Sequence, residues 1–150
     1  MKKILLLIIC ALFSISTFAQ EINDNADNII GDYFTEYGGS KGKIRVTKND
    51  NGTYKAQTIW IEKAYDKKGN KIKDVKNPDK SLRNIDIDKV VLAAGLKYDK
   101  ENRCWGGTKI YDPSRGIKAN VKAEFVDKNR LKLRGSIMGI GASVYWVRIK

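Results

Sequence analysis

The sequence predicts an all-β fold, an up-and-down antiparallel barrel of eight strands, and three observations support it. Apolar and polar residues alternate along several stretches of the chain, as in strands with one buried face. Most of these stretches are joined by short turns rich in Gly, Asn and Asp. No stretch has the pattern of a long amphipathic helix. A closed barrel is favoured over a sandwich because joining the first strand to the last removes exposed sheet edges.

The first nineteen residues have the pattern of a cleaved secretory signal peptide. Lys2 and Lys3 precede an apolar run at residues 4–13, and Thr17-Phe18-Ala19 places small residues before Gln20. The apolar run is too short to span a bilayer, and no later segment of the mature chain has the pattern of a transmembrane helix. The sequence therefore predicts an exported protein, either periplasmic or secreted.

The mature chain is predicted to begin with a leader, followed by one barrel domain. Residues 20–29 are acidic and rich in Asn, which predicts a flexible leader or a short helix, and the barrel domain takes residues 30–150. Residues 66–83 are the least regular part and are interpreted as a long surface connection. The eight strands are expected at residues 30–34, 43–48, 54–63, 90–98, 103–111, 117–126, 131–138 and 143–149.

The strand near residue 120 shows the alternation most clearly. Apolar side chains occupy every second position from Ile117 to Phe125, and the positions between them are mostly charged. Two connections are typical of turns, Asn51-Gly52 between strands and Asp112-Pro113 at a strand end. Glycines inside the expected strands predict bulges or bends of the barrel, at Gly95, Gly106, Gly107 and Gly135.

Composition excludes several classes of chemistry. The sequence has no His, which excludes Ser-His-Asp triads, Cys-His pairs and His-ligated metals. Outside the signal peptide the only Cys is Cys104, expected to be buried, so no internal disulfide can form. The formal net charge of +12 attracts anionic partners, including an anionic envelope surface, although alternating lysines are also expected on a solvated outer face. Nucleic acid is disfavoured because most aromatic residues lie among apolar neighbours.

The interior of an eight-stranded barrel is either filled by its own side chains or open to one small ligand, and the sequence leaves both possibilities. If it is open, the candidate lining residues are Trp60, Trp105, Phe125 and Tyr145. Arg83 is the candidate rim residue for an anionic head group, with an arginine that pins a turn at Asn77-Pro78-Asp79 as the alternative. No catalytic residue, metal site or cofactor is predicted.

Three functions are compatible with these residues. The first is a non-enzymatic binding protein for an apolar or amphipathic, lipid-like small molecule. The second is a basic adaptor of the cell envelope that binds a protein or polyanion through its outer surface, with a filled barrel core. The third is a hydrolase or isomerase that uses carboxylates such as Asp86 and Asp88 together with Tyr111, and only generic residue types favour it.

Several short motifs occur in order along the mature chain: Gly31-Asp32-Tyr33, Ile59-Trp60-Ile61, Asn77-Pro78-Asp79 with Leu82-Arg83, Trp105-Gly106-Gly107, Ile110 to Pro113 with Gly116, Leu131 to Gly135, and Trp146-Val147-Arg148. In their order and spacing they resemble an exported bacterial family, domain of unknown function 2147. The resemblance implies an eight-stranded lipocalin-like barrel and an exported protein, and it implies no reaction. Two departures are visible, since Tyr33 replaces a Trp found in many relatives and the cysteine pair of many relatives is missing.

Overall fold

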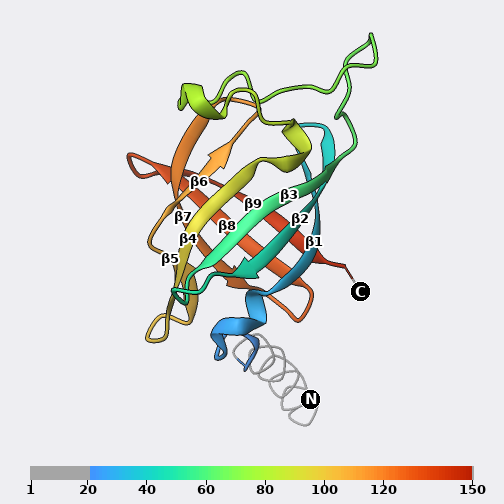
Figure 1. Cartoon of the computed structure of the whole chain (residues 1–150). Helices are drawn as coiled ribbons and strands as arrows, with labels where there is room; N and C mark the ends of the chain where they lie inside the picture. Colours follow the sequence, from blue (N-terminus) through green and yellow to red (C-terminus); the bar gives the residue numbers. More distant parts are fainter. Residues whose placement is uncertain (1–20, 150) are drawn as a thin grey trace, which may run out of the picture.

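The computed structural model describes residues 21–149, where nearly all regular structure is β-strand (Figure 1). The expected signal peptide at residues 1–19 lies outside the described residues. Among residues 21–149 no helix has the length and apolar character needed to cross a bilayer. The strands are β1 (Gly31–Tyr37), β2 (Ser40–Lys48), β3 (Tyr54–Ile61), β4 (Val91–Asp99), β5 (Cys104–Gly106), β6 (Lys109–Asp112), β7 (Ile117–Phe125), β8 (Arg130–Ile137) and β9 (Ile140–Arg148). Three short 3-10 helices are η1 (Ala26–Ile29), η2 (Lys80–Leu82) and η3 (Ile87–Lys89).

The strands form one closed antiparallel barrel with eight strand positions. β5 and β6 share one position, separated by a two-residue break that contains Gly107 at φ +71°. β5 pairs with β4 on one side and, through Trp105 and Ala123, with β7 on the other. β1 pairs with β9 through Tyr33 and Arg148, and every other strand pairs with its sequence neighbour. The predicted eight-stranded barrel is confirmed, and the break at Gly107 is one of the predicted irregularities.

The two ends of the barrel carry different connections. At one end lie residues 21–30 and the short turns β2–β3, β4–β5 and β7–β8. At the other end, called the mouth, lie the turns β1–β2, β6–β7 and β8–β9. Residues 62–90, called the strap, connect β3 to β4 across the mouth and contain η2 and η3 (Figure 1).

Residues 21–29 pack against the end opposite the mouth and are called the plug. Ile29 is completely buried, and Asn23 exchanges two hydrogen bonds of 2.8 and 2.9 Å with the main chain of Phe125. The Trp105 indole donates to the Ala26 carbonyl at 3.0 Å. Of the two alternatives for this segment, a flexible leader or a short helix, the described residues 21–29 fit the second, because they form a short helical cap with specific contacts. Its apolar residues lie on one side, and Ile22 also packs on the core.

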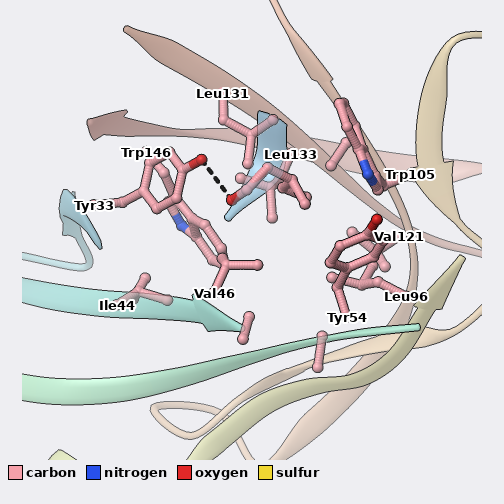
Figure 2. Close-up of a cluster of buried hydrophobic side chains, with 14 of the residues drawn as sticks. Tyr33, Ile44, Val46, Tyr54, Leu96, Trp105, Val121, Leu131, Leu133 and Trp146 are labelled. Carbon is pink, nitrogen blue, oxygen red and sulfur yellow. Dashed lines mark hydrogen bonds between the residues drawn. The ribbon is translucent and has the colours of Figure 1, made fainter. Parts of the chain in front are cut away.

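Aromatic rings fill the half of the interior next to the plug. Trp105 packs edge-on against Phe125 with 5.8 Å between ring centroids. The rings of Tyr33 and Trp146, which lie side by side in Figure 2, have centroids 6.1 Å apart. The Arg148 guanidinium stacks over the rings of Tyr33 and Phe125, at 5.3 and 5.2 Å. This packing completes a solid core at the plugged end. Cys104 is buried beside this core as expected, and burial raises the pKa of its thiol.

Candidate ligand-binding cavity

The half of the barrel next to the mouth is hollow. A cavity of about 890 Å³ occupies it, and its floor is formed by Ile44, Leu133 and Trp146, which also belong to the packed core. Its volume lies within the roughly 300–1,000 Å³ range of small-molecule sites. The walls are mainly aliphatic or small side chains from most strands, among them Ile61, Leu92, Ile110, Ile117, Ala119, Gly135, Ala142 and Val144.

The cavity reaches the space between β1 and β9 near the mouth. These two strands pair only at Tyr33–Arg148 and Phe34–Val147, close to the plugged end. Closer to the mouth, five consecutive residues of β9, 140–144, line the cavity, together with Thr35 of β1. In a fully paired strand only every second residue faces the interior. The run of five therefore indicates that the unpaired edge of β9 borders the cavity.

A bulge in β3 decides which of its side chains face inward. Ile44 of β2 pairs with Thr58 and Lys43 pairs with Trp60, so Ile59 is an extra residue on β3. Beyond the bulge the facing is inverted, and Ile61 lines the cavity. Trp60 instead lies on the outer wall, 41% exposed, with the Lys43 ammonium 5.5 Å from its ring. The expected inward position of Trp60 is wrong for this reason.

The other three aromatic candidates also lie away from the cavity. Trp105 and Phe125 point into the barrel but are buried in the packed half, beneath the plug. Tyr145 is 45% exposed on the outer face, because Val144 and Trp146 are the residues of β9 that point inward there. None of the four lines the cavity, and a role for them in ligand binding stays a prediction.

Arg83, the rim candidate, stabilises the strap. Its Nε donates to the Asn77 carbonyl at 2.7 Å. The Asn77 side chain accepts from the Asp79 amide at 2.9 Å, and Asp79 in turn caps η2 by accepting from the Ser81 amide. This is the turn-pinning alternative that the sequence left open. Arg83 does not line the cavity.

A buried carboxylate anchors the strap to the barrel wall. Asp74 of the strap accepts 2.7 Å hydrogen bonds from the Tyr111 hydroxyl of β6 and from the Asn77 amide. Burial raises the pKa of Tyr111, and the hydrogen bond to Asp74 raises it further. Asp74 and Tyr111 both line the cavity and form its polar corner. Sequence reasoning missed Asp74, whose only signal was its place between apolar residues of the strap, Ile72 and Val75.

Polar contacts cross the mouth. Arg115 of the β6–β7 turn donates to Asp112 at 2.7 Å and to the Tyr37 hydroxyl of β1 at 2.9 Å. Burial of Asp112 opposes its ionisation, but hydrogen bonds from Ser114 and Arg115 outweigh burial and hold its pKa below the usual range. β1 and β6 stand on opposite sides of the barrel. The contact between Arg115 and Tyr37 therefore crosses the mouth from β6 to β1. It does not cover the neighbouring side of the mouth, where β1 meets β9.

Two lysines at the mouth have no acidic partner within the described residues. Lys63 donates to the Gly39 carbonyl at 2.8 Å, and Lys76 donates to the Ser114 carbonyl at 2.6 Å. No carboxylate of residues 21–149 lies within ion-pair distance of either ammonium, although both side chains line the cavity. The mouth therefore carries uncompensated positive charge next to aliphatic walls.

The carboxylates considered for catalysis are paired elsewhere. Asp86 accepts from Lys73 at 2.5 Å, which together with its other lysine neighbours holds the pKa of Asp86 below its usual value, and Asp88 is paired with Lys71. Neither carboxylate lines the cavity. In the described part of the chain no group of three or more Asp, Glu, Cys or His could hold a metal ion. The hollow interior also removes one premise of the adaptor hypothesis, which assumed a filled barrel.

Comparisons with known proteins agree with this architecture. The family model described as "Uncharacterized protein conserved in bacteria (DUF2147)" matches residues 31–148. Among solved structures, the chain is similar to protein HP1028 of Helicobacter pylori, which belongs to the lipocalin family. The two share 27% sequence identity with a TM-score of 0.64, over 81% of this chain and 83% of the other. No curated protein matches the chain.

Proposed function

The chain belongs to the DUF2147 family, and we propose that it is a non-enzymatic binding protein for an amphipathic small molecule with an apolar chain and an anionic head. One observation carries this proposal: the mouth half of a lipocalin-like barrel is hollow and aliphatic, while its rim carries lysines that have no acidic partner among residues 21–149. The ligand chemistry follows from the walls and the rim, taken in turn below.

The walls favour an apolar chain. Burying a methylene group contributes about 0.8 kcal/mol, so a ligand whose apolar chain packs against aliphatic walls gains affinity with each carbon. Small residues at Ala119, Gly135 and Ala142 leave the space that the chain would occupy. Aliphatic walls offer few polar partners, so a sugar or a nucleotide would leave its own polar groups without hydrogen bonds there.

The rim favours an anionic head group. Lys63 and Lys76 are the mouth cations that donate only to main-chain carbonyls, and each ammonium keeps donors for a carboxylate or a phosphate. Arg115 is held by Asp112 and Tyr37 and is a weaker candidate. With the apolar chain of the ligand packed against the cavity floor, the anionic head of the ligand would lie among these lysines.

A displacement assay with a matched pair of variants tests this proposal. Ala119 faces the cavity, and its neighbour Asn120 is exposed on the outer side of β7. We expect Ala119→Trp to fill the cavity and to weaken binding of a fluorescent fatty acid at least about tenfold. The reason is that the acyl chain of the probe loses the space in which its apolar surface would be buried. Asn120→Trp adds the same side chain outside and should bind like the wild type. Equal binding by both variants, or no binding by the wild type, would overturn the proposal.

We also infer that the protein works outside the cytoplasm, in the periplasm or in the medium. The support is the pattern of residues 1–19, with its basic start, apolar run and small residues before Gln20. Mass spectrometry of the protein recovered from a periplasmic or culture fraction should find a chain that begins at Gln20. An intact N-terminus on protein confined to the cytoplasm would contradict this inference.

A further inference from the structure

The β8–β9 turn carries the most exposed apolar side chains of the described residues. Met138 is 97% exposed and Ile140 84%, and Ile137, which pairs with Ile140 across the hairpin, is about half exposed. These three residues are called the tip. The β8–β9 hairpin projects from the barrel (Figure 1). Exposed single apolar residues are common, but three within four positions at the end of a hairpin form a patch.

The fold does not require apolar residues at the tip. Met138 has φ +51° and Gly139 φ +80°, the left-handed conformations of a two-residue hairpin turn in which Asn, Asp or Gly is strongly preferred. A methionine there adopts a conformation unfavourable for a side chain with a Cβ. At 97% exposure it buries almost no surface in return. Methionine at position 138 is thus unfavourable for the turn and gains no burial within the fold. This indicates that its side chain contacts a partner outside the protein.

The tip lies at the mouth, where positive charge gathers. Ile137, Met138 and Ile140 line the outer edge of the cavity, whose rim also includes Lys63 and Lys76. On the strap, the apolar Val75 is 66% exposed at the same end of the barrel. The whole chain carries a formal net charge of +12. An apolar projection surrounded by cations complements a surface with an anionic outer layer and an apolar interior.

We propose that the tip inserts into the surface of an anionic phospholipid bilayer and holds the mouth against it. Met138 and Ile140 enter the acyl region, and the rim lysines contact lipid phosphates. The unpaired edge of β9 borders the cavity directly behind the tip, so docking brings this edge of the cavity to the membrane. The tip lies at the outer edge of the cavity, and its docking to a bilayer goes beyond ligand binding in solution.

Vesicle sedimentation tests this proposal, with the same full chain expressed for every variant and identical N-termini verified by mass spectrometry. The probes are phosphatidylcholine vesicles and vesicles with about 30% phosphatidylglycerol, at low and high salt. We expect binding to the anionic vesicles only, with a clear loss at high salt. The double variant Met138→Ser/Ile140→Ser should bind at least about tenfold more weakly, because two apolar side chains no longer enter the bilayer.

Two control variants keep the test specific. Val147→Ser/Ile149→Ser changes two partly exposed apolar residues at the plugged end and should bind vesicles like the wild type. Met138→Leu/Ile140→Leu keeps the tip apolar and should also retain binding. Ala119→Trp fills the cavity but leaves the tip unchanged, so this variant should still bind the anionic vesicles while it loses the fluorescent fatty acid in vesicle-free solution. Failure of this proposal is thereby distinguishable from failure of the cavity proposal.

Several outcomes would overturn the membrane proposal. One is equal vesicle binding by the wild type and the serine tip variant, and another is no binding by the wild type at low salt. A third is wild-type self-association, seen by light scattering, that the serine tip variant abolishes without any change in vesicle binding. That result would make the tip a contact between copies of the chain.

Discussion

The plugged half and the mouth half of the barrel are built from the same strands but filled differently. Toward the plug, the inward positions hold large rings such as Tyr33, Trp105 and Phe125, and residues 21–29 close the end. Toward the mouth, the same strands present Ile117, Ala119 and other aliphatic or small side chains around empty space. The comparison teaches that stability and binding are divided along the barrel axis, so each can be changed by substitutions that leave the other largely intact.

The largest expected effect is on stability at the plugged end. Trp105→Ala removes a fully buried indole and its hydrogen bond to Ala26, and we expect the free energy of unfolding to fall by about 3–5 kcal/mol. Ile110→Ala at the cavity wall should cost less than half as much, because Ile110 already borders empty space. Urea unfolding of the two variants measures this difference. Equal losses would contradict the division into a packed and a hollow half.

A pH effect of intermediate size is expected from the same packed half. Burial is the main cause that raises the pKa of Tyr33 to about 12, against a usual value of 10.0. Between these values the unfolded chain loses the Tyr33 proton while the folded protein keeps it, so ionisation favours unfolding. The contribution of protonated Tyr33 to the free energy of unfolding is therefore fully present below pH 10. It is lost as the pH rises toward 12, and the loss is roughly 2–3 kcal/mol.

The comparison that isolates Tyr33 is the variant Tyr33→Phe. Urea unfolding at pH 9 and at pH 11.5 should show a smaller alkaline loss for the variant than for the wild type. Other tyrosines and lysines titrate in both proteins, so the difference between the two losses reports on Tyr33. An identical alkaline loss in both would mean that Tyr33 ionises as it does in the unfolded chain.

Much of the fold could be predicted from the sequence because it depends on local patterns. Alternation from Ile117 to Phe125 set the facing of β7, and the turn residues Asn51-Gly52 and Asp112-Pro113 marked strand ends. Burial of Cys104 was expected from its place in a predicted strand, between Arg103 and Trp105. These features are fixed by side-chain period and turn chemistry within a few residues.

The site was predicted less well because it depends on contacts between distant segments. The bulge at Ile59 turns Trp60 outward, and only the pairing with Lys43 and Ile44 shows where the extra residue lies. The aromatic candidates Trp105 and Phe125 were sensible for an apolar interior, but large rings fill a barrel rather than leave it open. Small inward residues near the mouth, such as those at 119, 135 and 142, were the better signal.

The most direct test of the central claim is calorimetric titration of the wild type with saturated fatty acids of increasing length. If the hollow half takes an apolar chain, each added methylene should tighten the dissociation constant by about fourfold, equivalent to about 0.8 kcal/mol, until the cavity is full. Beyond that length the affinity should stop rising. Affinities that do not change with chain length, or no binding at any length, would contradict the account.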